Sequence, residues 1–462
     1  MNGASTSLAR KRVTVLGLGK SGVAACDLLL ERGAIVKASD QKPAEAILAA
    51  PDLAARGVTL ELGGHDPDTA RGSDLVVISP GIREDIEPVV RARRAGIPVV
   101  SEVELASWFL RGRVIGITGS NGKTTTTALT GAVLAGAGLD ARVGGNIGRP
   151  VCTLLSGATD ATLHVLELSS FQLDTSPTLR CHVAVLLNVT PDHLDRYGTF
   201  DRYAASKARI FKNQRPEDVA ICNADEPVTL SLSAGIPAQR HLFSSTRKPV
   251  PIARGAWLTE GGGDAAVVIA PDGVPVLAMK SSEIPLLGRH NRENVMAALL
   301  TAWAVGADLE KAAAAVRAFR PVAHRLELVA EKDGVAWVND SKATNLDAVK
   351  TALAAIAGPV AIILGGRDKG ATWSELVPLL RGRARIVLTV GEAAPIVEAA
   401  LAGEVAMTRV ASMRDAVAEA RRATHPGDTV LLSPGCASFD MFRSYEHRGQ
   451  VFAEEVRSCL AS

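Results

Sequence analysis

The sequence predicts an α/β protein made of three domains in series. Short β-branched runs alternate with longer alanine- and leucine-rich helical patterns, which favours parallel sheets with crossover helices. At 462 residues, the chain is too long for a single hydrophobic core. We place the three domains at residues 1–111, 112–320 and 321–462.

Composition and charge argue against several classes of protein. Hydrophobic residues make up 47% of the chain and charged residues 22%, as in an ordinary globular protein. The net charge of +2 is too small to suggest binding to nucleic acid or to an anionic membrane surface. No apolar stretch reaches the roughly 18 residues of a membrane span, and the six cysteines are scattered without a CxxC pair, which suits a reducing compartment. We expect a cytoplasmic protein, without membrane insertion or nucleic-acid binding, and we expect a monomer.

The first domain opens with a glycine-rich turn between a strand and a helix. Residues 17–22 fit the GxGxxG dinucleotide pattern, and Asp40 ends the next strand roughly 20 residues on. A helix N-terminus behind a tight glycine turn accepts any pyrophosphate, so NAD and a UDP-sugar both suit it, and a turn without a ligand is the third interpretation. The pattern predicts three strands and one helix, at Arg12–Gly17, Ile35–Ser39, Leu75–Ser79 and Ser21–Arg32.

The central domain begins with a nucleotide-binding loop. An apolar run, Val114–Thr118, feeds a glycine-rich turn that ends in Gly-Lys-Thr and opens into a helical pattern. Such a turn points backbone N–H groups at phosphates, while Lys123 supplies charge for the β- and γ-phosphates and Thr124 offers a hydroxyl to Mg²⁺. Ile117 stands where the general P-loop pattern has its first glycine. The sequence predicts that this domain, of the P-loop ATPase type, binds ATP or GTP.

Polar side chains follow two later strands of the central domain. Glu167 ends an apolar strand, and an acid at this position completes the Mg²⁺ shell in P-loop enzymes; a solvated glutamate is the alternative. Residues 188–197 bring acids and His193 to the end of another strand, although the same turn would also cap the next helix. Lys207 lies on a predicted helix and, from periodicity alone, is a surface lysine. The predicted strands are His164–Leu168, Val183–Asn188 and Val219–Asn223, followed by an antiparallel insertion at Ala256–Met279, and the predicted helices are Tyr203–Lys212, Asn294–Ala304 and Leu309–Phe319.

The third domain carries three polar loops that each follow a predicted strand. They span Asn339–Asn345, Gly365–Lys369 and Ser433–Asp440, and we expect them to crowd one edge of a sheet. Lysines and hydroxyls gathered there suit a dicarboxylate substrate, whereas an ordinary turn is the alternative for each loop alone. Pro321 is the expected linker and hinge. The predicted strands are Arg325–Ala330, Ala336–Asn339, Ala361–Leu364, Arg385–Val390 and Thr429–Leu432.

Four of these motifs together resemble the Mur ligase family, the cytoplasmic ATP-dependent amino-acid ligases of peptidoglycan synthesis. They are, in chain order, Thr118–Thr124, Glu167–Leu173, Asn188–Tyr197 and Asn339–Asn345. The last motif is most similar to the branch that adds D-glutamate to UDP-N-acetylmuramoyl-L-alanine. The resemblance extends from Gly17 to about Gly449. It implies a Rossmann-like UDP-binding first domain, a central ATP-binding domain and a Rossmann-like third domain that binds the amino acid.

The resemblance implies a UDP-sugar site in the first domain instead of an NAD site. The turn at residues 17–22 is then the pyrophosphate cradle, and the family's uracil-contacting pair falls on Gln41 and Lys42. The other implied contacts to this substrate and its reacting end are Gly19, Lys20, Ser21, Ser79, Gly81, Asn146, Ser169 and His193.

The same resemblance assigns the ATP and magnesium sites. The implied ATP contacts are Gly119, Asn121, Gly122, Lys123, Thr124, Thr125, Asn291, Asn294, Arg325 and Asp340. Two Mg²⁺ ions are expected, with Thr124, Glu167, His193 and Lys207 as ligands. Lys207 matches the family's carbamylated lysine, in which CO₂ converts the neutral amine into an anionic oxygen ligand. The implied catalytic residues are Lys123, Glu167, His193 and Lys207.

The implied amino-acid pocket and reaction complete the expectation. D-Glutamate is to be held by Lys342, Thr344, Lys369, Ser438 and Tyr445, where Tyr445 replaces a phenylalanine of the family. The substrate carboxylate is phosphorylated by ATP to an acyl phosphate, which the amino group of D-glutamate attacks. Three alternatives stay open: a sister ligase with another amino acid or a folylpolyglutamate synthase, an NAD-dependent oxidoreductase, and a nucleotide switch without catalysis.

Overall fold

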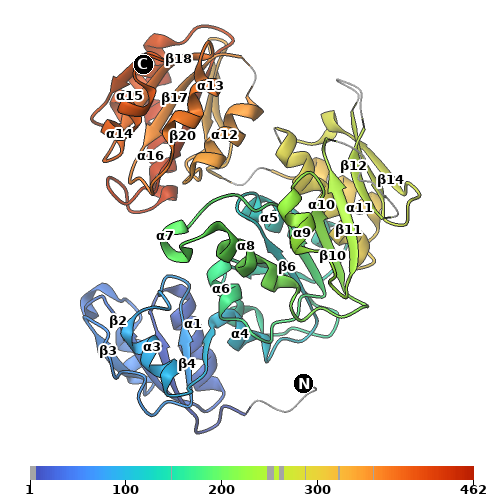
Figure 1. Cartoon of the computed structure of the whole chain (residues 1–462), viewed down its shortest axis with the longest axis vertical. Coiled ribbons are helices and arrows are strands. Elements are labelled where there is room, and N and C mark those ends of the chain that lie inside the picture. The colour runs from blue at the N-terminus through green and yellow to red at the C-terminus, as the bar shows by residue number, and fades with distance from the viewer. Residues whose placement is uncertain are drawn as a thin grey trace.

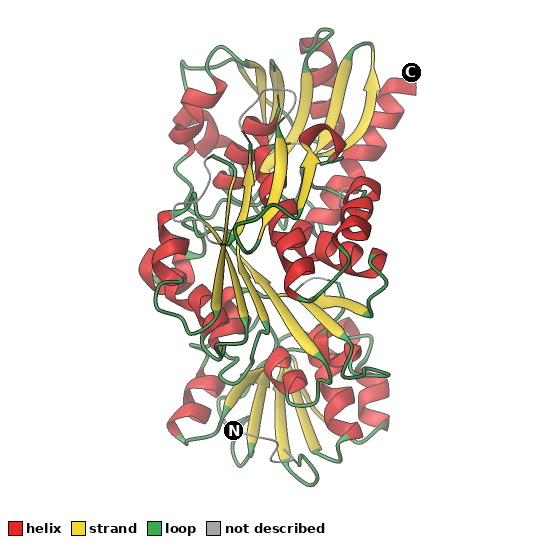
Figure 2. Ribbon diagram, turned by 90° about the vertical axis from the view of Figure 1, so that its right-hand side faces the viewer, coloured by secondary structure: helices red, strands yellow, loops and turns green. Residues whose placement is uncertain are grey.

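Three α/β units follow one another along the molecule (Figure 1). The computed structural model describes residues 7–146, 148–246, 254–259, 265–286, 288–320, 323–356 and 358–461, and across them the strands form three sheets. Helices flank the sheets on both sides (Figure 2). The predicted three-part α/β architecture is therefore confirmed. The predicted boundaries after residues 111 and 320 fall between the sheets, and the proposed hinge residue Pro321 lies outside the described residues.

The first unit contains, among the described residues, a five-stranded sheet in the order β3-β2-β1-β4-β5, with all neighbouring strands parallel. Its strands are β1 (Arg12–Leu16), β2 (Ile35–Asp40), β3 (Thr59–Leu62), β4 (Leu75–Ile78) and β5 (Val99–Ser101). Its helices are α1 (Lys20–Glu31), α2 (Ala50–Ala55), α3 (Glu87–Arg94) and α4 (Glu102–Ser107). The strand order reverses between β1 and β4, so the glycine turn after β1 lies where open α/β sheets bind ligands.

Close packing explains the glycines of this turn. Gly17 has a φ of +88°, and a Cβ on Gly22 would lie 1.8 Å from the Gly17 carbonyl oxygen. Only glycine therefore lets α1 approach the turn so closely. The Ser79 hydroxyl donates to the same carbonyl oxygen at 2.8 Å, and the Asp40 carboxylate accepts from the Leu18 N–H at 2.6 Å. Asp40 thus braces the turn from within the protein.

The central unit contains, in the part of the chain described, a nine-stranded sheet in the order β14-β13-β12-β11-β10-β9-β6-β8-β7. Its strands are β6 (Arg113–Thr118), β7 (Ala141–Gly145), β8 (Leu163–Glu167), β9 (Val183–Leu186), β10 (Val219–Asn223), β11 (Gln239–Ser244), β12 (Gly255–Leu258), β13 (Ala266–Ala270) and β14 (Leu277–Lys280). Its helices are α5 (Lys123–Gly136), α6 (Ser170–Asp174), α7 (Leu194–Tyr197), α8 (Phe200–Ala208), α9 (Pro227–Leu232), α10 (Arg289–Ala304) and α11 (Leu309–Ala318). The pairs β12–β13 and β13–β14 are antiparallel, as predicted, but they extend the parallel sheet because β12 pairs with β11.

The third unit contains, over its described residues, a six-stranded sheet in the order β15-β16-β20-β17-β18-β19. Its strands are β15 (Glu327–Lys332), β16 (Val335–Asn339), β17 (Val360–Gly365), β18 (Ala384–Val390), β19 (Met407–Arg409) and β20 (Thr429–Gly435). Its helices are α12 (Leu346–Ala355), α13 (Val377–Leu380), α14 (Ala394–Leu401), α15 (Met413–Ala423) and α16 (Tyr445–Ala461). The edge strand β15 is antiparallel to β16, and the other pairs are parallel. Because β15 begins at Glu327, Arg325 lies in the loop before it and not in the predicted strand.

Strand register brings the polar loops of each sheet to one edge. In the central sheet, Ile117 of β6 pairs with Glu167 of β8, and Thr118 pairs with Leu186 of β9. In the third sheet, Asn339 of β16 pairs with Leu432 of β20. The nucleotide loop, Glu167 and the turn after β9 therefore share one edge, and the polar loops after β16 and β20 share another.

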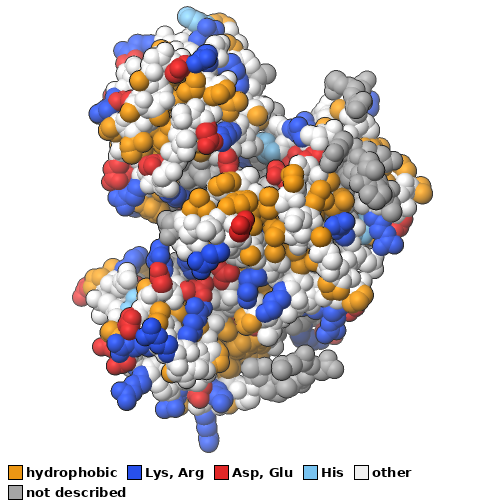
Figure 3. Space-filling model, in the orientation of Figure 1, with side chains coloured by type: hydrophobic (Ala, Val, Ile, Leu, Met, Phe, Trp, Pro, Cys, Tyr) orange, Lys and Arg blue, Asp and Glu red, His pale blue; other side chains and the backbone are white. Residues whose placement is uncertain are grey.

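Burial and charge fit a globular protein. The middle of α10, Val295–Leu300, is fully buried between the central sheet and neighbouring helices. Basic and acidic side chains are interspersed over the face drawn in Figure 3, as expected from a net charge of +2. Among the described residues, none of the helices has both the length and the apolar character needed to cross a membrane.

Candidate active site

The nucleotide loop joins β6 to the start of α5 and requires its glycine. Gly122 has a φ of +84°, and a Cβ there would lie 2.8 Å from Oδ1 of Asn294. That oxygen accepts a hydrogen bond from the Thr126 hydroxyl at 3.0 Å, and the Asn294 amide donates to Oδ1 of Asn291 at 2.8 Å. The two asparagines of α10 therefore support the loop from beneath, and Asn294 also reaches the cavity beside it.

Two lysines converge on the carbonyl oxygen of Gly119. Lys123 Nζ donates to the carbonyl oxygens of Gly119 and Ser120, both at 2.8 Å. Lys207 Nζ donates to the Gly119 carbonyl oxygen at 2.8 Å, and its side chain is only 1% exposed. Burial lowers the pKa of the Lys207 amine well below its ordinary value, and the nearby charge of Lys123 lowers it further. The surface-lysine interpretation of Lys207 is therefore wrong, and its amine is suited to the neutral state.

Glu167 presents a carboxylate oxygen without a partner. Its side chain is 2% exposed, Oε1 accepts from the Asn146 amide at 3.2 Å, and Oε2 is buried without a hydrogen bond. An unpaired buried carboxylate oxygen is costly in isolation, and a bound cation would satisfy it. The hydroxyl of Thr124, in the first turn of α5, lines the same cavity as Glu167. The carboxylate oxygen and the hydroxyl oxygen are the kinds of ligand that fit a Mg²⁺ site.

His193 is held in an unusual backbone conformation at the start of α7. Its φ is +53°, and its backbone N–H donates to Oδ1 of Asp192 at 2.9 Å. The ring packs edge-on against Phe171, with centroids 4.9 Å apart. Burial lowers the pKa of His193, which keeps the imidazole neutral at pH 7 and leaves a nitrogen lone pair available as a ligand.

The third unit contributes a lysine and an aspartate beside the nucleotide loop. Lys342 Nζ donates to the Thr124 hydroxyl at 2.5 Å, and burial lowers the pKa of Lys342 to about 7. Asp340 accepts from the Ser433 hydroxyl at 3.0 Å, and burial raises the pKa of this carboxyl to about 6. Because burial disfavours the charged form of the Lys342 amine, an anionic ligand beside it would stabilise that charged form.

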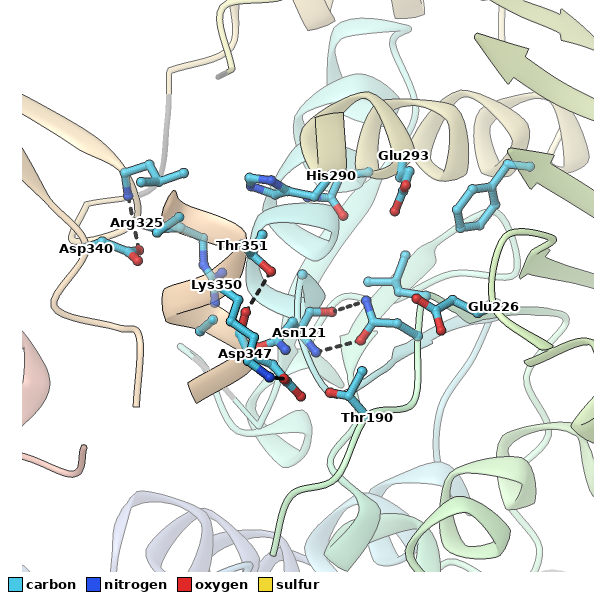
Figure 4. Close-up of a pocket in the computed structure, with 18 residues that line it drawn as sticks. Asn121, Thr190, Glu226, His290, Glu293, Arg325, Asp340, Asp347, Lys350 and Thr351 are labelled. Atoms are coloured by element: carbon cyan, nitrogen blue, oxygen red, sulfur yellow. Dashed lines mark hydrogen bonds and ion pairs between the residues drawn. The ribbon is translucent and has the colours of Figure 1, made fainter. Parts of the chain in front are cut away.

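Two adjoining cavities meet at the nucleotide loop. One, of about 250 Å³, runs from Asn121 to α10 and α12, and its lining includes Glu226, Glu293 and Lys350 (Figure 4). The other, of about 450 Å³, gathers residues from all three units. The predicted residues that line it are Lys20, Ser21, Asn121, Gly122, Lys123, Thr124, Asn146, Glu167, His193, Arg325, Lys342, Thr344, Lys369 and Tyr445. The arrangement can hold a nucleotide beside an elongated anionic substrate.

Family profiles match the chain in the same order as its sheets. The profile of the Mur ligase MurD-like N-terminal domain matches residues 11–101, that of the Mur ligase middle domain residues 117–302, and that of the Mur ligase glutamate ligase domain residues 324–436. The UDP-N-acetylmuramoylalanine–D-glutamate ligase of Acidobacterium capsulatum is 46% identical over 447 residues, which cover 96% of each chain. The enzyme of the same name from Anaeromyxobacter dehalogenans is 47% identical over 455 residues, which cover 97% of this chain and 98% of the relative.

The chain belongs to the Mur ligase family. Solved structures show the same fold at lower identity. The UDP-N-acetylmuramate-alanine ligase of Thermotoga maritima has a TM-score of 0.62 at 19% identity, covering 97% of this chain and 100% of its own. The MurF ligase of Thermotoga maritima, in complex with ADP, has a TM-score of 0.61 at 18% identity, covering 98% and 97%. Membership of this family decides against the NAD-dependent oxidoreductase interpretation.

Several residues predicted for this Mur ligase lie outside both cavities. They are Gly19, Ser79, Gly81, Gly119, Thr125, Ser169, Lys207, Asn291 and Ser438. Ser79 is bonded to the Gly17 carbonyl oxygen. Ser169 caps α6, where its hydroxyl accepts from the Gln172 N–H at 3.3 Å. Their contacts to substrate remain predictions, as do those of Gln41 and Lys42, whose side chains are exposed at the end of β2.

The sequence predicted no role for three supporting residues of this Mur ligase. The Asn188 side chain accepts from the Asn121 N–H at 2.8 Å and donates to the Asn121 carbonyl oxygen at 3.1 Å, so it shapes the nucleotide loop (Figure 4). The hydroxyls of Tyr203 and Ser120 share a hydrogen bond at 3.1 Å, and the centre of the Tyr203 ring lies 4.6 Å from Lys207 Nζ. Asn188 opens a motif shared with the family, but neither an asparagine after a strand nor a tyrosine on a helix indicates such a supporting role by itself.

The third such residue, Arg448, is a buried arginine that joins two loops of the third unit. Its side chain is 1% exposed and donates to the Ser341 hydroxyl at 3.0 Å and the Ser341 carbonyl oxygen at 2.8 Å. It also donates to the Cys436 carbonyl oxygen at 3.1 and 3.2 Å. Burial lowers its pKa to about 10, so the guanidinium is still charged at pH 7. Arg448 thus holds together the loops that carry Lys342 and Ser438.

Replacing Arg448 with alanine is expected to lower the free energy of unfolding by about 2–4 kcal/mol. The change leaves the carbonyl oxygens of Ser341 and Cys436 without these donors and opens a cavity. Urea unfolding followed by circular dichroism measures the loss. Arg457→Ala, an exposed position on the same helix, is the control and should change stability by less than about 0.5 kcal/mol. Equal midpoints for the two variants would contradict the bracing role.

Proposed function

We propose that this Mur ligase joins D-glutamate to UDP-N-acetylmuramoyl-L-alanine, with conversion of ATP to ADP and phosphate, in the synthesis of peptidoglycan precursors. The identity of 46% to a D-glutamate ligase over 96% of the chain carries the proposal. The larger cavity supports it, because side chains from all three units line that cavity. The five buried cysteines form no disulfide bond, which fits the proposed cytoplasmic location. We also infer a monomer.

The UDP-sugar is proposed to lie between the first and central units. Lys20 and Ser21 begin α1, where free backbone N–H groups and the helix dipole attract a pyrophosphate. Asn146 lines the same cavity from the central unit. The sugar and its L-alanyl carboxylate would therefore extend from α1 towards Glu167 and His193.

ATP is proposed to bind along the nucleotide loop and into the smaller cavity. Its phosphates would take the backbone N–H groups at the start of α5, and Lys123 Nζ would exchange its bonds to the loop carbonyl oxygens for the phosphates. Arg325 lines both cavities, so its guanidinium would face the phosphates from the third unit. An arginine in this position neutralises charge that develops during phosphoryl transfer.

Two Mg²⁺ ions are proposed beside these phosphates. Thr124, Glu167, His193 and carbamylated Lys207 would hold them, and the low pKa of Lys207 supports carbamylation because CO₂ adds only to the neutral amine. Among the described residues, no cluster of three or more His, Cys, Asp or Glu side chains forms a ready metal site. Phosphate oxygens and water are therefore needed to complete each coordination shell. When bound, the ions neutralise the negative charge of the phosphates.

Two steps connect these sites chemically. The L-alanyl carboxylate oxygen attacks the γ-phosphorus, the bond to ADP breaks, and an acyl phosphate forms. The neutral amine of D-glutamate then attacks the acyl carbon, phosphate leaves, and the amine proton passes to solvent. Lys342 and Lys369 line the larger cavity, and we propose that they hold the D-glutamate carboxylates, which would orient its amine towards the acyl carbon. Transfer within the cavity keeps water away from the acyl phosphate.

Phosphate release with single amino acids tests the proposal. In the presence of Mg·ATP and UDP-N-acetylmuramoyl-L-alanine, release is expected to appear when D-glutamate is added and to stay at background with L-glutamate, L-alanine or a diamino acid. Release with one of the other amino acids would move the chain to a sister branch of the family. Nucleotide binding without release under any condition would favour a nucleotide switch.

A further inference from the structure

A hydrogen bond joins the third unit to the turn that carries His193. The Asn345 side-chain amide donates to Oδ2 of Asp192 at 3.1 Å, across 153 residues of sequence. Asn345 lies between β16 and α12, whereas Asp192 lies between β9 and α7. In Figure 1, α7 projects towards the third unit, and the bond is made just before it in the chain.

The Asn345 end of this bond has a fixed orientation. Its Oδ1 accepts from the Ala348 N–H at 2.9 Å and so caps α12. The amide nitrogen is therefore turned towards the central unit. Helix α12 also forms a wall of the smaller cavity through Lys350 and Thr351 (Figure 4). The position of that wall is thus tied to the bond with Asp192.

The Asp192 end reaches His193. Oδ1 of Asp192 accepts from the His193 backbone N–H at 2.9 Å, while Oδ2 accepts from Asn345. His193 has a left-handed backbone with a φ of +53°, which a non-glycine residue keeps only when its surroundings hold it. The Asp192 carboxylate therefore connects α12 to the conformation of His193.

The choice of residue at 345 exceeds what a helix cap needs. Serine, threonine, aspartate and asparagine all cap helices well, so capping alone does not require asparagine. Among these four, asparagine is the one that pairs a cap acceptor with a side-chain N–H₂ donor. The additional donor is used by Asp192.

We propose that Asn345 and Asp192 are a positioning pair, which seats the third unit on the central unit and holds His193 in its active conformation. The proposal rests on the function proposed above and adds to it two residues without a previous assignment. Lys342 lies three positions before Asn345 and contacts Thr124. The pair would therefore also hold the loop that carries Lys342 at the nucleotide site.

An exchange of the two side chains tests the pair. Asn345→Asp keeps the cap but places a second carboxylate against Asp192, and we expect turnover to fall about tenfold or more through like-charge repulsion. The double variant Asp192→Asn with Asn345→Asp restores a donor and an acceptor with reversed polarity. It should recover at least half of the loss on a logarithmic scale. Melting temperatures of all variants should stay within a few degrees of the parent.

Two further measurements keep the outcome decisive. Asp308→Asn is the control, because it also swaps a carboxylate and an amide at a helix N-cap. Asp308 caps α11, where it accepts from the Glu310 and Lys311 N–H groups, and the variant should leave turnover unchanged. Hydrogen exchange of residues 188–197 should quicken in Asn345→Asp and slow again in the double variant. If Asn345→Asp kept the parental turnover and the parental rate of hydrogen exchange, the proposed pair would be overturned. The proposal would also be overturned if hydrogen exchange in the double variant were no slower than in Asn345→Asp. Failure of the proposed reaction would instead appear in the parent protein, as missing phosphate release with D-glutamate.

Discussion

Phosphate release by the Lys123→Ala variant is expected to be at least about 100-fold slower than that of the parent. Loss of one preorganised charge contact to a transferring phosphoryl group has an effect of this size. Lys123 is the lysine of the nucleotide loop, and its amine lies 2.8 Å from two loop carbonyl oxygens. Burial lowers its pKa, so bound phosphate anions would favour its charged form. The rate of release at saturating substrates is the measurement.

Controls separate this loss from a damaged loop. Lys212→Ala removes an exposed lysine shortly after α8 and should retain the parental rate. The melting temperature of Lys123→Ala should stay near the parental value, since Asn188 and Asn294 still support the loop. A near-parental rate of phosphate release in Lys123→Ala would rule out the proposed role of this lysine.

Lys207→Ala is the second change with a large expected effect. The variant should lack measurable ligase activity and should be partly rescued by short-chain carboxylic acids, which can supply the missing anionic oxygens. The amine is buried against the Gly119 carbonyl oxygen, and its lowered pKa favours the neutral form that would react with CO₂. Activity assays with and without added acetate or propionate measure the rescue.

Depletion of CO₂ gives an independent reading of the same site. Activity of the parent should fall in CO₂-free buffer and return when bicarbonate is added, whereas Lys212→Ala should follow the parent in both conditions. Parental activity in Lys207→Ala, with no response to carboxylic acids, would assign this lysine a purely structural role.

Local sequence patterns were sufficient for many of the parallel strands and for some of the helices. Alternating apolar and helical runs predicted the parallel strands, and Val219–Asn223 was placed without error. The predicted strand Arg325–Ala330 begins two residues before β15, because nothing in the pattern indicates that the chain turns at Arg325 and Leu326. Short edge strands such as β3 and β19 were not predicted, because a few partly exposed residues carry little periodic signal.

Lys207 shows why a charged residue on a helix is hard to interpret. It follows Tyr203 by one helical turn, and both side chains face the nucleotide loop. A helix that buries a lysine has the same spacing as one that exposes it, so periodicity assigned it to the surface. The resemblance to the Mur ligases pointed to the site instead.

The chain by itself determined the order of the motifs, the nucleotide loop and the loops that follow β8, β9 and β16. These are local properties, because a glycine, a lysine or a strand end acts through its immediate neighbours. Which loops face one another was decided only in the tertiary structure. The contacts of Asn345 with Asp192 and of Arg448 with Ser341 join residues more than a hundred positions apart. Such contacts depend on how strands and units pack, and side-chain type alone does not record that packing.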